Sequence, residues 1–559
     1  MVPGMLYWTM PTLVIYSSFD CRIVSQAQRN LPAHLLVPFS FAIALPTSGD
    51  LHLSQDFEMA SYSSTFHRVV ALIWPILLTL VLASDPSSDL RALLTGNTVH
   101  WTPNTTILFP DEIDAFYNAT TRWTIYKPPA YSAVIQPGTE ADVVQVVKLA
   151  GSNRIPFLAT GGRHGYTTTL GNIQSGLEID LSQLNTVVID LESATMTIGG
   201  GATFADVMDP VHEAGFEIPT GSSSCPGMVG ATIGAGVGRY SGVYGLIIDS
   251  LLSAQLVTAD GRLIEVSKRS NPELFWAIRG AGANFGIITS AVYQLRTPIN
   301  RGLAVNADFI FSASVASAYF KALQTFNGSL PAELATASVI RYNETLNEPE
   351  ILANWVYMGP EDRAWEIMAP ILDINPPIVS SVIPWNKIIA TAGFEIDPLL
   401  CQDEVPRAIY SANVRNLSAS TYDSMFQRMG RFYADYPAAR SSLIEMEIFP
   451  NQAAVSVPYE ETAYPWRDAL GNMIFLFSWS GDNSTVVEAA NNLGRELRDD
   501  FVTTSGYPDL SVYVNYAYGD EGIEQIYGKD KLPRLAQLKK TWDPDDFFSY
   551  NNKLPNKYP

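Results

Sequence analysis

A six-residue turn, Thr160-Gly161-Gly162-Arg163-His164-Gly165, constrains this chain more than any other stretch. It directly follows the apolar run 155–159, which predicts a short buried strand. Glycines after a strand allow a sharp bend and bring backbone N–H groups close to an anion, usually a diphosphate. A histidine only adds bulk to a plain phosphate cradle, so its presence suggests chemistry. Taken alone, however, a loop histidine without a special role is the commoner case.

Length and charge narrow the class of protein. With 559 residues, of which 47% are hydrophobic, the chain can form two or more domains with sizeable cores. Its net charge of −21 argues against nucleic-acid binding, because phosphate contacts need clustered Lys and Arg. The charge favours neutral or cationic small molecules as partners, although an acidic surface also simply keeps a secreted protein soluble. No metal site is predicted.

The N-terminus reads as two joined segments. Residues 1–58 have no helical or strand period, whereas Met59 opens a stretch with His67-Arg68 and the apolar run 69–83, followed by small polar residues. This order is typical of a secretory signal peptide at 59–83, and the run is short for a membrane span. We infer that Met59 is the true start and that 1–58 is an upstream extension. The alternative is a genuine N-terminal anchor.

Glycosylation signals also favour secretion, with no membrane attachment after cleavage. Six Asn-x-Ser/Thr sequons all follow the predicted cleavage site, at Asn104, Asn118, Asn327, Asn343, Asn416 and Asn483. Only Cys225 and Cys401 remain after cleavage, so the chain is no disulfide scaffold. Whether these two cysteines pair is left open by the sequence.

Helix and strand signals alternate from Pro128 onward. Thr139 begins a capping box, and the residues after it place valines on one helical face. Asp260-Gly261 lies between two alternating runs, which predicts a hairpin. Further strands and helices are predicted at 177–181, 195–198, 203–212 and from Asn271-Pro272 to Gly280. Residues 128–298 are therefore predicted to form an α+β domain.

A second glycine-rich region spans Gly227–Arg239. It contains no G-x-G-x-x-G in a strand–helix unit with an acidic residue about 20 positions later, so a nicotinamide Rossmann site is disfavoured. Its many glycines suit close approach of the backbone to a flat, extended ligand. Tight helix packing through small residues is the alternative.

Several ordered motifs resemble one family. Pro128 to Pro298 resembles the FAD-binding domain of the vanillyl-alcohol oxidase/p-cresol methylhydroxylase (PCMH-type) superfamily, and more narrowly the berberine-bridge-enzyme-like oxidases of the fungal secreted branch. The motifs are the histidine turn, Gly227–Arg239, Tyr244–Asp249, Asn271–Gly282 with Asn284–Ile287, Tyr513–Tyr516, Arg534-Leu535 and Lys539–Asp545.

The resemblance implies an α+β fold of several parts. A lead-in segment (84–127) precedes the FAD-binding domain (128–298), and an α+β substrate domain with an antiparallel sheet follows (299–510). The last segment (511–559) would return to the FAD domain. Within the substrate domain, strands are predicted at 454–459 and 473–479 and a helix at 486–498.

The resemblance also implies a covalent cofactor. His164 would be bonded to the 8α-methyl group of FAD, and a linked flavin is both retained outside the cell and a stronger electron acceptor. The turn amides, those of Gly161, Gly162, Arg163, His164 and Gly165, would hold the diphosphate. Gly234 and Gly236 would let the backbone approach the cofactor.

Many members carry a second link, from a cysteine to the flavin. Ungapped counting places Ser223 at that position, and Cys225 lies two residues later. We therefore favour a single histidyl link, with a second link through Cys225 as the alternative. The same two counts place Pro226 or Met228 at the position that admits or blocks oxygen, so an oxidase is only favoured over a dehydrogenase.

The second tyrosine of the Tyr-x-Asn-Tyr motif, Tyr516, is the candidate base. A phenol can take the substrate's proton only if a neighbouring group lowers its pKa from about 10, and the sequence does not identify that group. On a strand, Tyr513 would face the opposite side. The family's Asp after this tyrosine is displaced here to Asp520. The alternative is that Tyr513 and Tyr516 are ordinary aromatic residues of a strand that line the core. Tyr464–Arg467 receives no catalytic role.

These features predict a secreted FAD-dependent oxidoreductase. It would transfer hydride from a small organic alcohol, sugar or amine to the flavin and then pass the electrons to O2. A nicotinamide-dependent reductase and a catalytically silent flavin-binding or structural glycoprotein are the alternatives.

Overall fold

The computed structural model describes residues 86–559, and the predicted signal peptide and upstream extension lie outside them. A first sheet has the strand order β1-β2-β4-β3, with β1 antiparallel to β2 and the other pairs parallel. Helix α5 follows β2 because Thr139 caps its first turn and its valine face is fully buried. The elements are β1 (Thr106–Leu108), β2 (Tyr131–Gln136), α5 (Glu140–Asn153), β3 (Phe157–Thr160) and β4 (Gly176–Asp180).

A second, five-stranded sheet is antiparallel, in the order β5-β6-β9-β7-β8. Asp260-Gly261 turns the chain between β7 and β8, with Gly261 at φ +73°. The capping box at Thr203 is also present. These elements are β5 (Val187–Asp190), β6 (Thr195–Gly199), α6 (Phe204–Glu213), α7 (Met228–Gly234), α8 (Ile247–Ser250), β7 (Leu251–Val257), β8 (Leu263–Ser267), α9 (Pro272–Ala281) and β9 (Ile287–Gln294).

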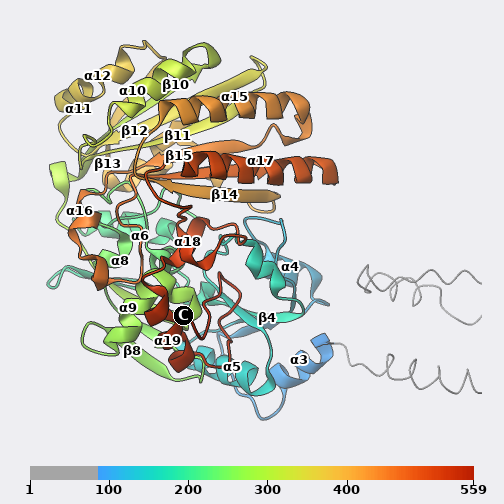
Figure 1. Ribbon diagram of the computed structural model, residues 1–559. Coiled ribbons are helices and arrows are strands. Elements are labelled where there is room, and N and C mark those ends of the chain that lie inside the picture. Colours follow the sequence, from blue (N-terminus) through green and yellow to red (C-terminus); the bar gives the residue numbers. More distant parts are fainter. Residues whose placement is uncertain (1–85) are drawn as a thin grey trace, which may run out of the picture. The chain divides into compact units, whose positions relative to one another are not determined.

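The third sheet is antiparallel and has seven strands, in the order β13-β10-β12-β11-β15-β16-β14. Helices α15 and α17 lie along it (Figure 1), packed against β11, β12, β14 and β16. The strands are β10 (Leu303–Ser312), β11 (Leu334–Asn343), β12 (Glu348–Tyr357), β13 (Ile378–Pro384), β14 (Arg407–Val414), β15 (Leu443–Ile448) and β16 (Gly471–Ser478). The helices are α10 (Ala316–Gln324), α11 (Glu361–Ile367), α12 (Ala369–Leu372), α13 (Ile388–Glu395), α14 (Asp397–Leu400), α15 (Ala419–Asp435), α16 (Gln452–Ser456) and α17 (Ser484–Val502).

The last segment packs back onto the FAD-domain elements, as the family resemblance implies. Helix α19 (Leu532–Trp542) contacts α9, and Lys539 Nζ donates to the backbone oxygen of Asn284 at 3.1 Å. The backbone N–H of Leu554 donates to Asn284 Oδ1. Two short helices, α3 (Pro86–Thr95) and α4 (Ile113–Thr120), precede β2, and α18 (Ile523–Tyr527) precedes α19. Among residues 86–559, no helix is long and apolar enough to cross a membrane.

Two strand predictions are wrong. Residues 454–459 begin in α16, whose N–H groups at Ala453 and Ala454 donate to the carbonyls of Gly242 and Ser241. Residues 513–516 contain a 3₁₀ turn, η10 (Val514–Tyr516), instead of a strand. Both runs are short, so contacts with distant loops outweigh their β propensity. The predicted strand at 473–479 and helix at 486–498 are confirmed as β16 and α17.

Candidate active site

The histidine turn leaves β3 with its backbone N–H groups unpaired. Among the described residues, none of the five amides from Gly161 to Gly165 donates a hydrogen bond to another group. Unpaired backbone N–H groups are rare in folded proteins, and a run of them in a turn forms an anion-binding cradle. Gly162 is required here, because a Cβ would stand 2.4 Å from the backbone nitrogen of Gly227. The turn therefore fits a diphosphate.

The side chain of Arg163 points away from this cradle. Its backbone is left-handed at φ +51°, and its guanidinium donates to the carbonyl oxygens of Asn118 and Ala119. It also lies 3.4 Å from Asp180 on β4. Only the backbone N–H of Arg163 thus remains for the predicted role in cofactor binding.

The imidazole of His164 is held neutral and unpartnered. Its ring stacks on the indole of Trp123, with 4.2 Å between ring centroids. Burial, followed by the nearby charges of Arg407 and Arg122, lowers the pKa of His164 to about 3. Its Nε2 is buried without a hydrogen-bond partner in residues 86–559. A neutral ring nitrogen without a partner is the form that can carry the predicted covalent link.

Gly234 at the end of α7 and Gly236, two residues later, make room for other protein segments. A Cβ on Gly234 would stand 2.1 Å from Oδ1 of Asn515, and one on Gly236 would stand 2.3 Å from Cβ of Ile247. The N–H of Gly236 donates to the hydroxyl of Tyr513 at 3.0 Å. These contacts match the packing alternative, and they hold the Tyr-x-Asn-Tyr motif against the FAD domain. The approach of Gly234 and Gly236 to FAD stays a prediction.

Tyr516 is hydrogen-bonded to a buried carboxylate. Its hydroxyl donates to Oε2 of Glu447 on β15 at 2.9 Å, and Ser222 donates to Oε1 of the same side chain at 2.6 Å. The carbonyl of Tyr516 accepts from Ser411 on β14 at 2.8 Å. Three distant segments, the FAD-domain loop, the large sheet and the last segment, thus meet at Glu447. Tyr516 also contacts the apolar cluster that contains Trp123, so it borders the same space as His164.

The neighbour of Tyr516 does not lower its pKa. Burial, and then the charge of Glu447, raise the pKa of Tyr516 well above 10. Burial also raises the pKa of Glu447, although Ser222, Tyr516 and Arg239 counteract it. A stable phenolate is therefore disfavoured, and the arrangement suits a relay in which Glu447 finally holds the proton.

The placement of Tyr513 also differs from the prediction. In the 3₁₀ turn, residues three positions apart lie on the same side. The rings of Tyr513 and Tyr516 accordingly meet edge to face, with 4.8 Å between centroids. Tyr464 packs edge to face on Tyr513 and is buried, while Arg467 makes a bidentate ion pair with Asp249 at 2.8 and 3.0 Å. Tyr464–Arg467 is thus structural.

A row of polar side chains crosses the large sheet in register. Five of the six aligned strands contribute a polar residue and β11 contributes Ala337; the polar residues are Asp308, Asn354, Glu447, Asn472 and Asn413. Burying polar groups on the face of a sheet is unfavourable in free energy unless they are hydrogen-bonded. Nevertheless Oδ1 of Asn354, Oδ1 of Asn472 and Nδ2 of Asn413 have no partner within residues 86–559. This face therefore offers polar atoms to a bound molecule.

Sequence reasoning missed Glu447, Glu445 and Ser222. A signal was present in Leu443–Ile448, where two glutamates occupy alternate positions of an otherwise apolar strand. Charged residues at core-facing positions of a strand are unfavourable unless they have a function, so this pattern indicates a functional site. Burial and the charge of Glu447 raise the pKa of Glu445 to about 8.

Cys225 forms a disulfide with Cys401, across 176 residues of sequence. The adjacent Ser224 donates its N–H and hydroxyl to Asp397, at 2.9 and 2.5 Å. The FAD-domain loop is thus fastened to α14. Because the sulfur of Cys225 is already bonded, the single histidyl link is favoured over a second link through this residue.

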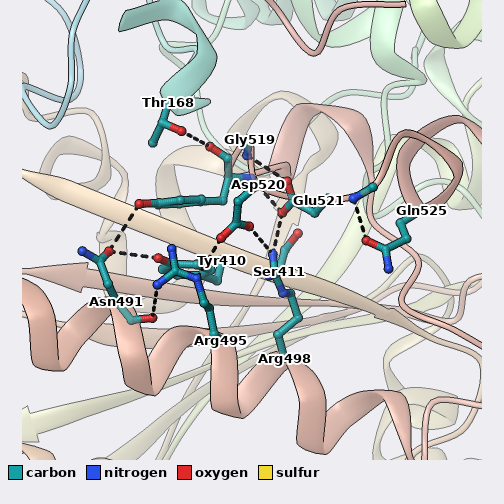
Figure 2. A network of polar contacts seen from close by, with 12 residues as sticks. Thr168, Tyr410, Ser411, Asn491, Arg495, Arg498, Gly519, Asp520, Glu521 and Gln525 are labelled. Atoms are coloured by element: carbon teal, nitrogen blue, oxygen red, sulfur yellow. Dashed lines mark hydrogen bonds and ion pairs between the residues drawn. The ribbon is translucent and has the colours of Figure 1, made fainter.

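Asp520 serves a structural network rather than Tyr516. Figure 2 shows Asp520 paired with Arg495 and Arg498 of α17, at 2.9 and 2.8 Å. Glu521 accepts from Arg498 and from the N–H groups of Tyr518 and Gly519. The chain immediately after Tyr516 is therefore anchored to the helix that covers the large sheet.

Comparisons with known proteins agree with this architecture. Residues 131–267 match the FAD binding domain family, and residues 512–555 match the family described as berberine and berberine like. The chain is 46% identical over 481 residues to the FAD-linked oxidoreductase fogF of Aspergillus ruber, covering 85% of this chain and 96% of that protein. It is 45% identical over 476 residues to the FAD-linked oxidoreductase srdI of Neurospora crassa, covering 84% and 94%.

Solved structures share the fold at low sequence identity. BBE-like 1 of Physcomitrella patens has a TM-score of 0.71 at 21% identity, covering 82% of this chain and 98% of that one. The xylooligosaccharide oxidase from Myceliophthora thermophila C1, in complex with xylobiose, has a TM-score of 0.69 at 21% identity, covering 80% and 96%.

Proposed function

This chain belongs to the berberine-bridge-enzyme-like family of FAD-linked oxidoreductases, and we propose that it is a secreted oxidase of a small organic alcohol, sugar or amine. The observation that carries the reaction type is the hydrogen bond from Tyr516 to Glu447, beside the apolar cluster whose Trp123 stacks on His164. Oxidation of C–OH or C–NH requires a group that removes the proton from the heteroatom. The relatives' names support an FAD-linked oxidoreductase.

The residues present fit FAD. Five unpaired amides in the histidine turn are suited to its diphosphate, and the unpartnered Nε2 of His164 is suited to a covalent histidyl link. When bound, FAD supplies two-electron acceptance, with O2 as the proposed final acceptor. A nicotinamide-dependent reductase receives no support, because the FAD binding domain family covers the glycine-rich turns.

The protein's own residues move the proton. The Tyr516 oxygen accepts the proton of the substrate heteroatom while its own proton passes to Oε2 of Glu447, 2.9 Å away. Ser222 keeps the carboxylate oriented through Oε1, and Ser411 fixes the backbone of Tyr516. Tyr516 therefore carries no lasting negative charge. The net result is one proton stored on Glu447 for each substrate oxidised.

Secretion and N-glycosylation are part of this proposal. Five of the six sequon asparagines are exposed, namely Asn104, Asn118, Asn327, Asn416 and Asn483, so a glycan on any of them would meet no buried surface. Sequencing the N-terminus of the secreted protein tests the predicted signal peptide. A mature chain that begins before Met59 would contradict it.

Two measurements test the function. After acid precipitation, the protein pellet should stay yellow because the flavin is covalently attached. A screen of alcohols, sugars and cyclic amines should then reveal hydrogen peroxide release. A colourless protein without cofactor would support the silent structural alternative, and flavin reduction without peroxide would indicate a dehydrogenase.

A further inference from the structure

A cavity lies between the large sheet, the FAD domain and the α13–α14 segment. Ser222 and Arg239 line it from the FAD domain, and Asn354 and Glu445 line it from the sheet. Most of its remaining wall is aliphatic, including Val339 and Leu352. Glu447 neighbours Glu445 two residues along β15 and accepts from Ser222, so the cavity adjoins the Tyr516–Glu447 pair.

Arg239 is a buried charged group of this cavity whose hydrogen-bond donors the fold does not satisfy. It is 7% exposed, and within residues 86–559 its guanidinium makes no hydrogen bond or ion pair; its one recorded contact is with the ring of Phe449, 5.8 Å from the ring centroid. Its Nε and Nη1 are both buried without a partner. A guanidinium carries five N–H donors and cannot be neutralised by deprotonation in a protein. Burying a charge without a partner raises the free energy of the folded protein. A bound molecule that accepts hydrogen bonds from Arg239 would offset this desolvation penalty.

The carboxyl groups near Arg239 do not fill this role. Both oxygens of Glu447 already accept hydrogen bonds, from Ser222 and Tyr516. Burial and the charge of Glu447 raise the pKa of Glu445, which favours its neutral form, and Glu445 makes no ion pair with Arg239 within residues 86–559. Asp397 accepts from Ser224, and Asp308 accepts from Asn354 and from the N–H groups of Gly393 and Phe394. The positive charge at the cavity wall therefore lacks a bonded counter-ion.

We propose that this cavity is the substrate site and that Arg239 selects an apolar substrate carrying an oxyanion, a carboxylate or a phenolate. The inference rests on the proposed function and adds the substrate class. The aliphatic wall would cover the body of the molecule, and Oδ1 of Asn354 would accept from a substrate hydroxyl or amine. This local charge preference is opposite to that of the whole chain, whose net charge is −21.

Three probes with one body and different head groups test this inference. Cinnamate, cinnamyl alcohol and cinnamylamine are titrated into the holoenzyme, with binding followed by calorimetry and by the visible spectrum of the flavin. We expect cinnamate to bind most tightly. The Arg239→Gln variant should weaken cinnamate binding by about 10–100-fold, the usual range for a charged hydrogen bond, and change alcohol binding less than about threefold.

Arg296→Gln is the matched control. Arg296 belongs to the same domain and also has a buried Nε without a partner, but it does not line this cavity. Its variant should bind all three probes as the wild type does. Tightest binding of cinnamylamine, equal binding of acid and alcohol, no saturable binding of cinnamate, or an unchanged Arg239→Gln would each overturn the proposal.

The cofactor is monitored separately. Arg239→Gln should retain as much acid-stable flavin as the wild type. Loss of flavin in this variant would show that Arg239 serves the cofactor and would also overturn the proposal. Because calorimetry detects the probes without turnover, a failure here is distinguishable from a failure of the proposed function. The latter would appear as wild-type protein without flavin or without peroxide release.

Discussion

Replacing Tyr516 by Phe tests the proton relay most directly. The change removes the oxygen that hydrogen-bonds to Oε2 of Glu447 at 2.9 Å and keeps the ring that packs on Tyr513. Glu447 would still accept from Ser222, so its carboxylate should stay in place. Fold and flavin content should therefore survive, while the path from substrate to Glu447 is interrupted.

The magnitude follows from the position of both groups on one path. General-base contributions are typically about 10²–10⁴-fold, which corresponds to about 3–5 kcal/mol of barrier. Tyr516→Phe should slow flavin reduction within this range and weaken substrate binding less. Glu447→Gln should cause a similar loss, because a glutamine cannot hold the transferred proton. Since the two residues act as a unit, the double variant should be little slower than the slower single variant.

The assay is anaerobic flavin reduction in a stopped-flow instrument, with the substrate found in the peroxide screen. Tyr513→Phe is unsuitable as a control, because the hydroxyl of Tyr513 contacts Gly236 and Asn515. Tyr433→Phe is better, since it also removes one buried hydroxyl, one that donates to the carbonyl of Ser442. A wild-type limiting rate in Tyr516→Phe would remove this residue as the base. Fully additive losses in the double variant would refute the relay.

The pH dependence adds an independent check. Protonated Glu447 cannot accept a proton, so the reduction rate should rise with pH. Because burial raises the pKa of Glu447, the rise should lie above the ordinary carboxylate range near 4.5. Glu447→Gln should lose this limb. A wild-type profile that is flat through that range would contradict the assignment.

Three further predictions concern the cofactor link, the disulfide and buried charge. His164→Ala should lose acid-stable flavin while the turn amides still hold much of the FAD; acid-stable flavin in this variant would place the link elsewhere. Cys225→Ser and Cys401→Ser should each cost about 2–5 kcal/mol of unfolding free energy without altering the flavin spectrum, and a spectral change confined to Cys225→Ser would reveal a second link. Burial raises the pKa of Glu178 to about 7. The stability gained from this protonated carboxyl is full below its unfolded pKa of about 4.5 and is lost as pH rises to about 7, by at most ~1.4 kcal/mol per pH unit. Thermal unfolding of Glu178→Gln should show a smaller decline over that window, and an equal decline would place the effect in other groups.

Local signals allowed much of the fold to be predicted. The helix after Thr139, the hairpin at Asp260-Gly261 and the strand before the histidine turn each depend on a few adjacent residues. Capping, turn and periodicity rules act at this range. The family resemblance supplied the antiparallel sheet and the return of the last segment, which no local rule contains.

The centre of the site could not be predicted, because it depends on non-local contacts. Glu447 acquires its role from Ser222 and Tyr516, which lie 225 and 69 residues away in sequence. The 3₁₀ turn at Tyr516 likewise reflects the anchoring of the following segment to α17 (Figure 2). A tyrosine's pKa cannot be assigned until its neighbours are known, and here the neighbour is an acid.

The wall of the proposed substrate cavity is fixed at two points, which bears on how selectivity arises. Gly393 and Phe394 lie in the left-handed region, at φ +66° and +62°, and both their N–H groups donate to the buried carboxylate of Asp308. Such backbone persists only where the surroundings hold it. At the other end of the same segment, the disulfide of Cys401 joins it to the FAD domain. A wall held by the sheet on one side and by the cofactor domain on the other cannot adapt much to its ligand. Selectivity should then come from the fixed polar groups of the cavity, among which Arg239 alone carries donors without a partner in residues 86–559.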